Sequence, residues 1–444
     1  MRRLIGRRII DMSKAKFLLP IIALMTLSAC SSNNPVSSTF DPVIDDPIFV
    51  DHSLNKPNKS FNNQHQKLKE EYVSSLNEFA LDFYSAISSK ENSVFSPVSI
   101  ATCYSMLYDG ALENSKEELK KMLHFGDSFN HLEEIQKMLL NTAINDTENG
   151  VTLDLAQSLW IDDDFAPRIN QEYVSKMEEY YYAEAYQGAL DSDEMHAMLA
   201  DYINKKTNNF LNVKKEDFEE YEGVLWLLNT IYFKSKWVHE FPKELNYDGF
   251  FLNINNRNSD VTFMTAKIES HYYKAENYMI SSIPYNGGFN MTILLPNYGT
   301  DYSKVLNDKS AVGALLNYYN TRNHISDTIT YNIPQFKIQK SYDLKKVLPN
   351  LGAIDIFDDD RANLFGLVED GAAKGNLYVG RSKHEAGIEV NNEGSEAAAY
   401  TIIEVDEKAA YPSDEVVFNV NRPFTYLISS SDGLPLFMGT INSL

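Results

Sequence analysis

The sequence predicts a domain that mixes α-helices and β-strands, because its apolar residues follow both periods. Apolar side chains recur at helical spacing from Leu68 to Ile87, so a helix is expected there. Residues 151–161 alternate as a half-buried strand does, and residues 331–338 and 414–421 are also strand-like. A run of small residues at 391–401 has the same two-residue period.

Two further segments predict helices. Pro97 suits the first turn of a helix, where its missing N–H leaves no hydrogen bond unmade. The run from Tyr173 to Tyr186 has helical spacing and leads into a strand-like turn. Cys103 lies in an apolar stretch and is expected to be a buried thiol without a disulfide partner.

Charge and length set broad bounds on function. The chain has 444 residues, a length that by itself favours two or three domains. Its net charge is −22, which argues against nucleic acid as a partner and against a basic face for polyanions.

The N-terminus predicts export. Lys14 and Lys16 precede an apolar run from Phe17 to Leu27 that is too short to span a bilayer comfortably. The run ends in Leu27-Ser28-Ala29-Cys30, which resembles the cleavage box of bacterial lipoproteins. The resemblance implies a signal peptide at residues 1–29 and a mature chain that begins at a lipidated Cys30.

That interpretation implies a protein anchored by lipid in the bacterial cell envelope, facing the periplasm or the cell exterior. A plain signal peptide or a short anchor helix is the alternative, and Met12 competes with Met1 as the start. Residues 30–65 are predicted to form a disordered tether, because this stretch is rich in Ser, Asn, Asp and Pro.

No motif of an enzyme active site occurs. The sequence lacks a Gly-x-Ser-x-Gly elbow, a His-Glu-x-x-His zinc motif and a phosphate-binding loop. His384-Glu385 comes closest to the zinc motif but lacks the second His. We therefore expect no catalytic residue, no metal site and no cofactor.

The run of small residues near the C-terminus carries the functional prediction. Ser395, Ala397, Ala399 and Thr401 fall on one face of an extended chain, and Gly394 before them permits a backbone turn. A segment of this kind can be an exposed loop or a strand that inserts into a sheet. A surface loop followed by an edge strand is the simpler alternative.

Several motifs in a fixed order resemble the serpins, the serine protease inhibitor family, from about Leu68 to Leu444. They are residues 92–100 (NSVFSPVSI), 228–237 (LNTIYFKSKW), 283–287 (IPYNG), 291–296 (MTILLP), 421–424 (NRPF) and 435–439 (PLFMG). The resemblance implies one α+β domain over residues 66–444. In this serpin fold, helices surround a large central mixed β-sheet and two smaller sheets, and a reactive-centre loop is exposed.

The resemblance also implies a suicide-type inhibitor of serine endopeptidases, with cysteine endopeptidases as a second class. The target cuts the loop and is trapped in a covalent complex while the freed loop inserts as a strand. It implies a hinge and a hydrogen-bonded shutter that gates the sheet. The hinge residues are Gly394, Ser395, Ala397, Ala399 and Thr401, and the shutter residues are Ser96, Ser99, Asn229 and His384.

Two positions depart from the family pattern. A Glu and a Lys usually pair at the top of the sheet, but this chain has Asn392 and Gln335 there. Two facing amides can hydrogen-bond, and replacing both charges leaves neither unpaired. Tyr400 stands where a small residue is usual, on the outward face.

The reactive bond follows from the family spacing. Counting about fourteen residues from Gly394, as the resemblance implies, places the bond at Lys408-Ala409. Ala409, Ala410 and Tyr411 are alternatives for the cut, although Pro412 disfavours cleavage just after Tyr411. The acidic Asp406-Glu407 pair would repel many trypsin-like enzymes.

Two other functions compete with inhibition. One is a non-inhibitory serpin that acts as a binding or chaperone-like protein, and the other is a hydrolase on an unrelated fold. The small hinge residues argue against the first, and the missing nucleophile motif argues against the second. Heparin is not an expected partner, because the segment from Gly126 to Gly150 is acidic, and the protein is expected to be a monomer.

Overall fold

The computed structural model describes residues 10–11, 63–126, 132–140, 144–146, 148–219, 223–320, 324–369, 377–395 and 416–444. Several predicted functional positions lie outside the described residues: Cys30, Ala397, Ala399, Thr401, Lys408 and Ala409.

Most of the helices come from the first half of the chain. They are α1 (Asn63–Ile87), α2 (Pro97–Gly110), α3 (Glu113–Met122), α4 (Leu132–Leu140), α5 (Gln171–Tyr180), α6 (Asp193–Lys206), α7 (Tyr302–Leu306), α8 (Lys309–Leu316) and α9 (Leu344–Val347). The predicted helix at 68–87 is present as α1, which begins at Asn63, inside the predicted tether. No helix in the described ranges is both long and apolar enough to cross a membrane.

The strands run from short edge pieces to long central ones. They are β1 (Ile10–Asp11), β2 (Ser93–Phe95), β3 (Ile144–Asp146), β4 (Val151–Asp162), β5 (Glu184–Gly188), β6 (Leu225–Lys236), β7 (Tyr247–Leu252), β8 (Asn258–Lys274), β9 (Tyr278–Tyr285), β10 (Phe289–Pro296), β11 (Ile325–Pro334), β12 (Phe336–Asp343), β13 (Lys383–Val390), β14 (Gly394–Ser395), β15 (Val416–Asn419), β16 (Phe424–Ser430) and β17 (Pro435–Ile441).

One sequence prediction fails between α5 and β5. The helical run was expected from Tyr173 to Tyr186, but α5 ends at Tyr180 and β5 begins at Glu184. The cause is tertiary. Tyr186 lies opposite Trp160 of β4 in a parallel ladder, and the two rings stack with centroids 4.4 Å apart. Cross-strand aromatic pairing therefore outweighs the local helical spacing.

The strands form a large central region and a second extended sheet. In the central region the order is β1-β5-β4-β6-β14, with β3 beside β4, and a separate pair joins β12 to β13. The second sheet has the order β15-β11-β8-β9-β10-β16-β17-β2, with β7 beside β8. The long strand β8 pairs with β7, β9 and β11 in this second sheet. The predicted α+β fold is confirmed.

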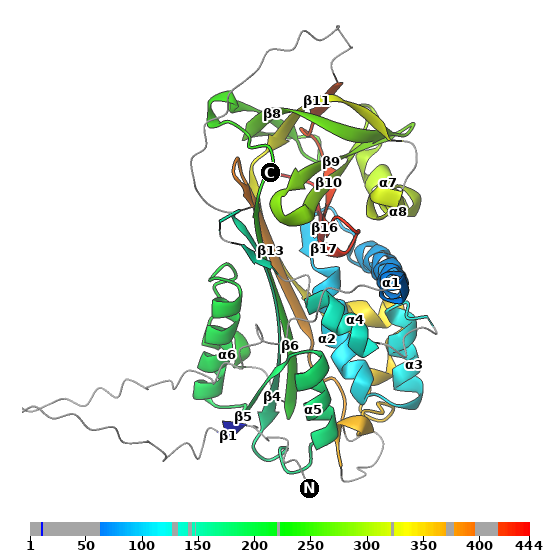
Figure 1. Cartoon of the computed structure of the whole chain (residues 1–444), viewed down its shortest axis with the longest axis vertical. Coiled ribbons are helices and arrows are strands. Elements are labelled where there is room, and N and C mark those ends of the chain that lie inside the picture. Colours follow the sequence, from blue (N-terminus) through cyan, green and yellow to red (C-terminus); the bar gives the residue numbers. More distant parts are fainter. Residues whose placement is uncertain are drawn as a thin grey trace, which may run out of the picture.

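Helices cover both faces of the central strands. Figure 1 shows α6 on one side of β4, β6 and β13, with α1 to α5 on the other side. Under α6, apolar residues pack on Trp160 and Tyr186 in a small core of their own, with Trp226 and Leu228 of β6 at its edge. The main core lies on the opposite face and continues beneath the second sheet.

Local sequence explains how α2 is positioned in that main core. Ser96 is its N-cap, and the Ser96 hydroxyl accepts a hydrogen bond from the backbone N–H of Ser99. Pro97 is the first helical residue, as predicted. The helix is buried along most of its length, and it reaches β6 at Cys103, whose Sγ lies 3.5 Å from the carbonyl oxygen of Leu227.

The candidate site: a gap in the central sheet and the segment that leads into it

The two halves of the central region are not hydrogen-bonded to each other. Within the described residues, β6 pairs only with β4 and β14, and β13 pairs only with β12. Both strands nevertheless line the same two cavities. Leu225–Ile231 and Lys383–Glu385 line one of about 280 Å³, while Ile231–Phe233 and Glu385–Glu389 line one of about 40 Å³.

Residue numbers rise in the same direction along both walls of these cavities, so β6 and β13 run parallel on the two sides of the gap between them. Their facing edges carry backbone N–H and C=O groups without a ladder partner. Such a gap can accept one more strand.

The chain turns into this gap directly after β13. Gly394 and Ser395 form β14, which pairs antiparallel with the end of β6: Gly394 lies opposite Lys236, and Ser395 opposite Ser235. Gly394 has a φ of +137°, and a Cβ there would overlap the carbonyl oxygen of Ser235. Only glycine fits this position, so the turn that starts the strand depends on Gly394.

A cluster of side-chain amides holds the residue just before this turn. Gln335 Nε2 donates to Oδ1 of Asn392 at 2.6 Å, so the two predicted top-of-sheet positions are in contact. Asn246 exchanges two hydrogen bonds with Asn392, at 2.7 and 3.0 Å, and Asn392 Nδ2 also donates to the carbonyl oxygen of Phe241 at 2.8 Å. Asn392 is 4% exposed, so these bonds satisfy a buried amide.

Sequence reasoning did not identify Asn246 or the neighbouring Trp237 as functional. Trp237 Nε1 donates to the carbonyl oxygen of Asn391 at 2.9 Å, and its backbone N–H donates to the carbonyl oxygen of Glu393 at 3.1 Å. The indole is buried and stacks on Tyr285, with ring centroids 4.1 Å apart. An end-of-strand Trp in the motif at 228–237 was the one available signal. Asn246 had none, because its partner lies 146 residues away.

Three of the four predicted shutter residues, Ser96, Ser99 and His384, are connected by hydrogen bonds. The backbone N–H of Ser96 donates to Nε2 of His384 at 3.0 Å, and the backbone N–H of Ser99 donates to Oγ of Ser96 at 3.2 Å. An acceptor Nε2 means that this imidazole is neutral. Burial lowers the pKa of His384 to about 3, which keeps it neutral at physiological pH.

Asn229 is the shutter position that the structure does not join to the rest. Within the described residues, neither Nδ2 nor Oδ1 of Asn229 has a hydrogen-bond partner, although both atoms are buried. Asn229, Ser99 and His384 all line the larger cavity. Oγ1 of Thr230, on the same cavity, is also buried without a partner among the described residues. Each unsatisfied buried polar group costs roughly 1–3 kcal/mol.

Cys103 also lines the larger cavity, and it is a free cysteine, as expected for a thiol without a disulfide partner. The residue is half-buried, because the space between α2 and β6 is not filled. Burial of the sulfur still raises the pKa of the Cys103 thiol to about 12, so the thiolate is scarce near neutral pH.

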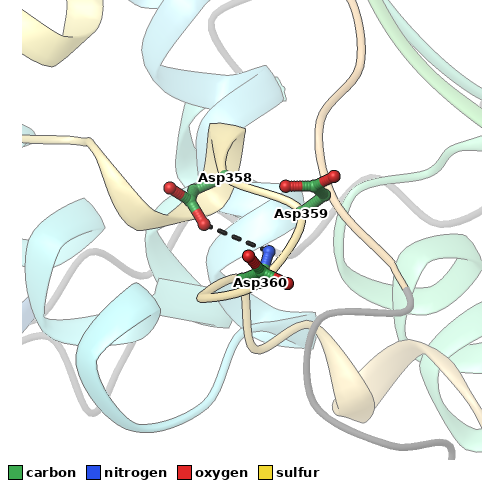
Figure 2. Close-up of side chains that lie close together, drawn as sticks. All are labelled: Asp358, Asp359 and Asp360. Carbon is green, nitrogen blue, oxygen red and sulfur yellow. Dashed lines mark hydrogen bonds between the residues drawn. The ribbon is translucent and has the colours of Figure 1, made fainter.

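Acidic groups come together in a loop that follows β12 and α9. Asp358, Asp359 and Asp360 lie close to one another, as Figure 2 shows. The backbone N–H of Asp360 donates to Oδ1 of Asp358 at 3.1 Å, and Arg361 pairs with Oδ2 of Asp358 at 2.9 Å. A hydrogen bond from Arg361 is the main reason that the pKa of Asp358 is lowered. These contacts close the loop and do not indicate a metal site.

The comparisons with known proteins agree with this geometry. Residues 74–444 match the family described as Serpin (serine protease inhibitor), and the chain belongs to that family. Members are generally protease inhibitors rather than enzymes.

Relatives and structures extend over most of the chain. Human Serpin B3 is 29% identical over 379 residues, covering 80% of this chain and 94% of its own. A serpin-like protein of Methanosarcina acetivorans is 28% identical over 397 residues, covering 84% of this chain and 87% of its own. The crystal structure of the thermophilic serpin tengpin, in its native state, is similar with a TM-score of 0.73. It is 23% identical and covers 87% of this chain and 96% of its own.

Proposed function

We propose that this serpin inhibits serine endopeptidases as a suicide substrate, with cysteine endopeptidases as a second target class. One observation carries the proposal: β14 starts an antiparallel strand at the top of a gap whose two walls, β6 and β13, do not pair with each other within the described residues. The residues that follow Ser395 continue from that start. Those expected to face inward, Ala397, Ala399 and Thr401, are small or β-branched.

The catalytic groups are those of the protease. The serpin provides the peptide bond that is cut and the loop that inserts after the cut. The serine hydroxyl of the target attacks the carbonyl carbon of Lys408, the bond to the nitrogen of Ala409 breaks, and an ester remains at Lys408. The new amino terminus at Ala409 stays on the C-terminal piece, whose strands β15, β16 and β17 remain part of the second sheet. Insertion of the freed loop moves the ester-linked protease before water can hydrolyse the ester.

Backbone hydrogen bonds provide the driving force for insertion. A new strand between β6 and β13 makes on the order of ten of them, at about 1 kcal/mol each. It also covers the cavity and the unpaired amide of Asn229. The uncleaved protein is held short of this state because its loop is tied at both ends, to β14 and to β15.

The test is a panel of serine and cysteine proteases followed by denaturing gels. We expect a complex with at least one serine protease that survives boiling in detergent, because the link is covalent. Mass spectrometry of the released C-terminal peptide should locate the cut between Glu407 and Tyr411. Clean cleavage without a trapped complex across the panel would contradict inhibition and favour the non-inhibitory binding function.

Lys408 is proposed as the recognition residue because it is the only cation from Gly394 to Asp414. Lys408→Ala should slow inhibition of Lys- and Arg-specific proteases and spare elastase-like ones. Equal inhibition rates of trypsin-like enzymes by both proteins would assign recognition to another residue.

We further propose a lipid anchor at Cys30 in the cell envelope. Labelled palmitate should enter the wild-type protein, and Cys30→Ala should release the protein from membranes during fractionation. A Cys30→Ala protein that stays on membranes, together with an unlabelled wild type, would indicate an uncleaved anchor helix.

A further inference from the structure

Two histidines approach each other at one end of the second sheet. His271 lies near the end of β8 and is exposed, and His324 directly precedes β11. Their ring centroids lie 6.4 Å apart. The expectation of no metal site came from motifs within single segments of the sequence. Such motifs do not record two side chains that the pairing of β8 with β11 brings together.

Tyr318, in the turn after α8, contacts both histidines. Its ring stacks on the imidazole of His324, with centroids 4.3 Å apart and an angle of 20° between the planes. Its hydroxyl donates to the backbone carbonyl oxygen of His271 at 2.8 Å. Tyr318 is itself buried, so a fixed side chain holds the imidazole of His324 and the backbone of His271 next to each other.

The two ring nitrogens of His324 differ in their contacts. Within the described residues, Nε2 is buried and has no hydrogen-bond partner. Burial lowers the pKa of His324, and a hydrogen bond with the backbone of Tyr318 opposes part of that change. Because Nε2 makes no hydrogen bond, the bonded nitrogen is Nδ1. A metal-ligating histidine usually donates its other ring N–H to a carboxylate or a backbone carbonyl, which fixes the tautomer and the ring. His324 thus presents an unshared lone pair at Nε2.

We propose that His271 and His324 bind a Zn²⁺ ion through one ring nitrogen each. Neutral imidazole is a preferred ligand of zinc. Zn–N bonds of about 2.1 Å place two nitrogens of a tetrahedral ion about 3.4 Å apart, and a small rotation of the exposed His271 ring achieves this. Glu269 is also exposed and lies two residues before His271, so its carboxylate favours a cation on the same face of β8. This site goes beyond the proposed inhibition and does not depend on it.

Matched variants separate the ligands from the residue that positions them. His271→Ala removes the exposed ligand, and His324→Ala removes the ligand that Tyr318 holds. Tyr318→Phe keeps the stacked ring and removes only the hydroxyl that bonds the backbone of His271. His239→Ala deletes another exposed histidine, which follows β6, and serves as the control.

The experiment measures Zn²⁺ binding to the untagged, chelator-treated protein by calorimetry, and Co²⁺ binding by its visible absorption. Zn²⁺ should raise the melting temperature of wild type, because it binds the folded pair. Each histidine variant should weaken binding at least about a hundredfold and Tyr318→Phe about tenfold, since even outer-shell partners contribute ten- to hundredfold. The His271→Ala/His324→Ala double variant should bind no more tightly than either single variant, and His239→Ala should match wild type.

Absence of Zn²⁺ binding by wild type, or binding as tight as wild type by both His271→Ala and His324→Ala, would overturn the site. An equal loss in His239→Ala would also overturn it, because the ion would then be held elsewhere. His271 is exposed, so weaker binding by His271→Ala at an unchanged metal-free melting temperature identifies a lost ligand and not a folding defect. Protease trapping is measured without metal, so its failure would contradict the proposed function and leave the zinc site standing.

Discussion

The top and the middle of the gap in the central sheet differ in how their polar groups are satisfied. At the top, the amide of Asn392 is buried and fully bonded to Gln335, Asn246 and the backbone of Phe241. In the middle, the amide of Asn229 is buried and has no partner among the described residues. Hydrogen bonds therefore fix the turn at Asn392, where the chain enters the gap. Farther along the gap, the amide of Asn229 still lacks a partner.

This difference indicates where free energy remains to be gained. Ordering the turn at Asn392 and Gly394 has already been achieved in the uncleaved protein. Pairing along β6 and β13 has not, because the ladder from β14 covers only Lys236 and Ser235. Changes that block extension of the strand beyond Gly394 should therefore abolish trapping, whereas changes in the amide cluster around Asn392 should alter the stability of the uncleaved protein.

Ser395→Arg should have the largest effect, which is the loss of protease trapping. Ser395 begins the inward face of the predicted strand, and an unpaired buried guanidinium costs several kcal/mol. The variant should be cut at the same bond but released as a substrate, since each 1.4 kcal/mol slows insertion about tenfold. Glu396→Arg, on the outward face, is the matched control and should remain inhibitory. Equal stoichiometry of inhibition for the two would contradict the alternation of faces.

Asn392→Leu should have the next largest effect, now at the top of the gap. The substitution leaves the buried partners on Gln335, Asn246 and Phe241 without their bonds, so we expect a loss of about 3 kcal/mol in the stability of the uncleaved protein. Glu393→Gln affects only a pair with Lys243, which is 69% exposed, and should cost less than about 1 kcal/mol. Urea unfolding separates the two. Similar losses for both variants would show that the amide cluster is not special.

Thr401→Val tests whether insertion satisfies the middle of the gap. If the ladder of β14 continues in register, each step along the loop is one step back along β6, which brings Thr401 opposite Asn229. The hydroxyl can then bond the free amide, so Thr401→Val should reduce the gain in stability on cleavage by about 1–2 kcal/mol. Thr401→Ser keeps the hydroxyl and should behave as wild type. An unchanged gain for Thr401→Val would mean another register.

The smallest expected effect is a pH dependence from His384. Its folded pKa of about 3 lies below the ordinary unfolded value of about 6.5, so the unfolded chain binds the proton more readily. The stability that this group contributes is complete above about pH 6.5 and is lost as the pH falls towards 3. Between about pH 7 and pH 5.5, wild type should lose about 1 kcal/mol more than His384→Gln in urea unfolding. Parallel losses in the two proteins would show that His384 is not the group responsible.

Local signals allowed much of the fold to be predicted. The N-cap Ser96 with Pro97, the alternation in β4 and the period of α1 each act over one turn or one strand. The run at 173–186 was misassigned at its end because Trp160, far away in sequence, recruits Tyr186 into a sheet. The contact of Gln335 with Asn392 was expected from the family alignment of motifs, since nothing local links positions 57 residues apart.

The remaining features of the site depend on tertiary contacts and could not be predicted from sequence periodicity. Asn246 and Trp237 hold the start of the loop through contacts with residues about 150 positions away, which no periodicity records. Asn229 and His384 line the same cavity, but the amide of Asn229 has no hydrogen-bond partner within the described residues, and no sequence pattern indicates this.

Hydrogen–deuterium exchange before and after cleavage of the loop tests the central claim most directly. The backbone amides of β6 (Leu225–Lys236) and β13 (Lys383–Val390) face an unfilled gap in the uncleaved protein. After cleavage by any protease that cuts between Glu407 and Tyr411, exchange along the facing edges of both strands should slow together, because a new strand pairs with each. Unchanged exchange in β6 and β13 after complete cleavage would contradict insertion into this gap.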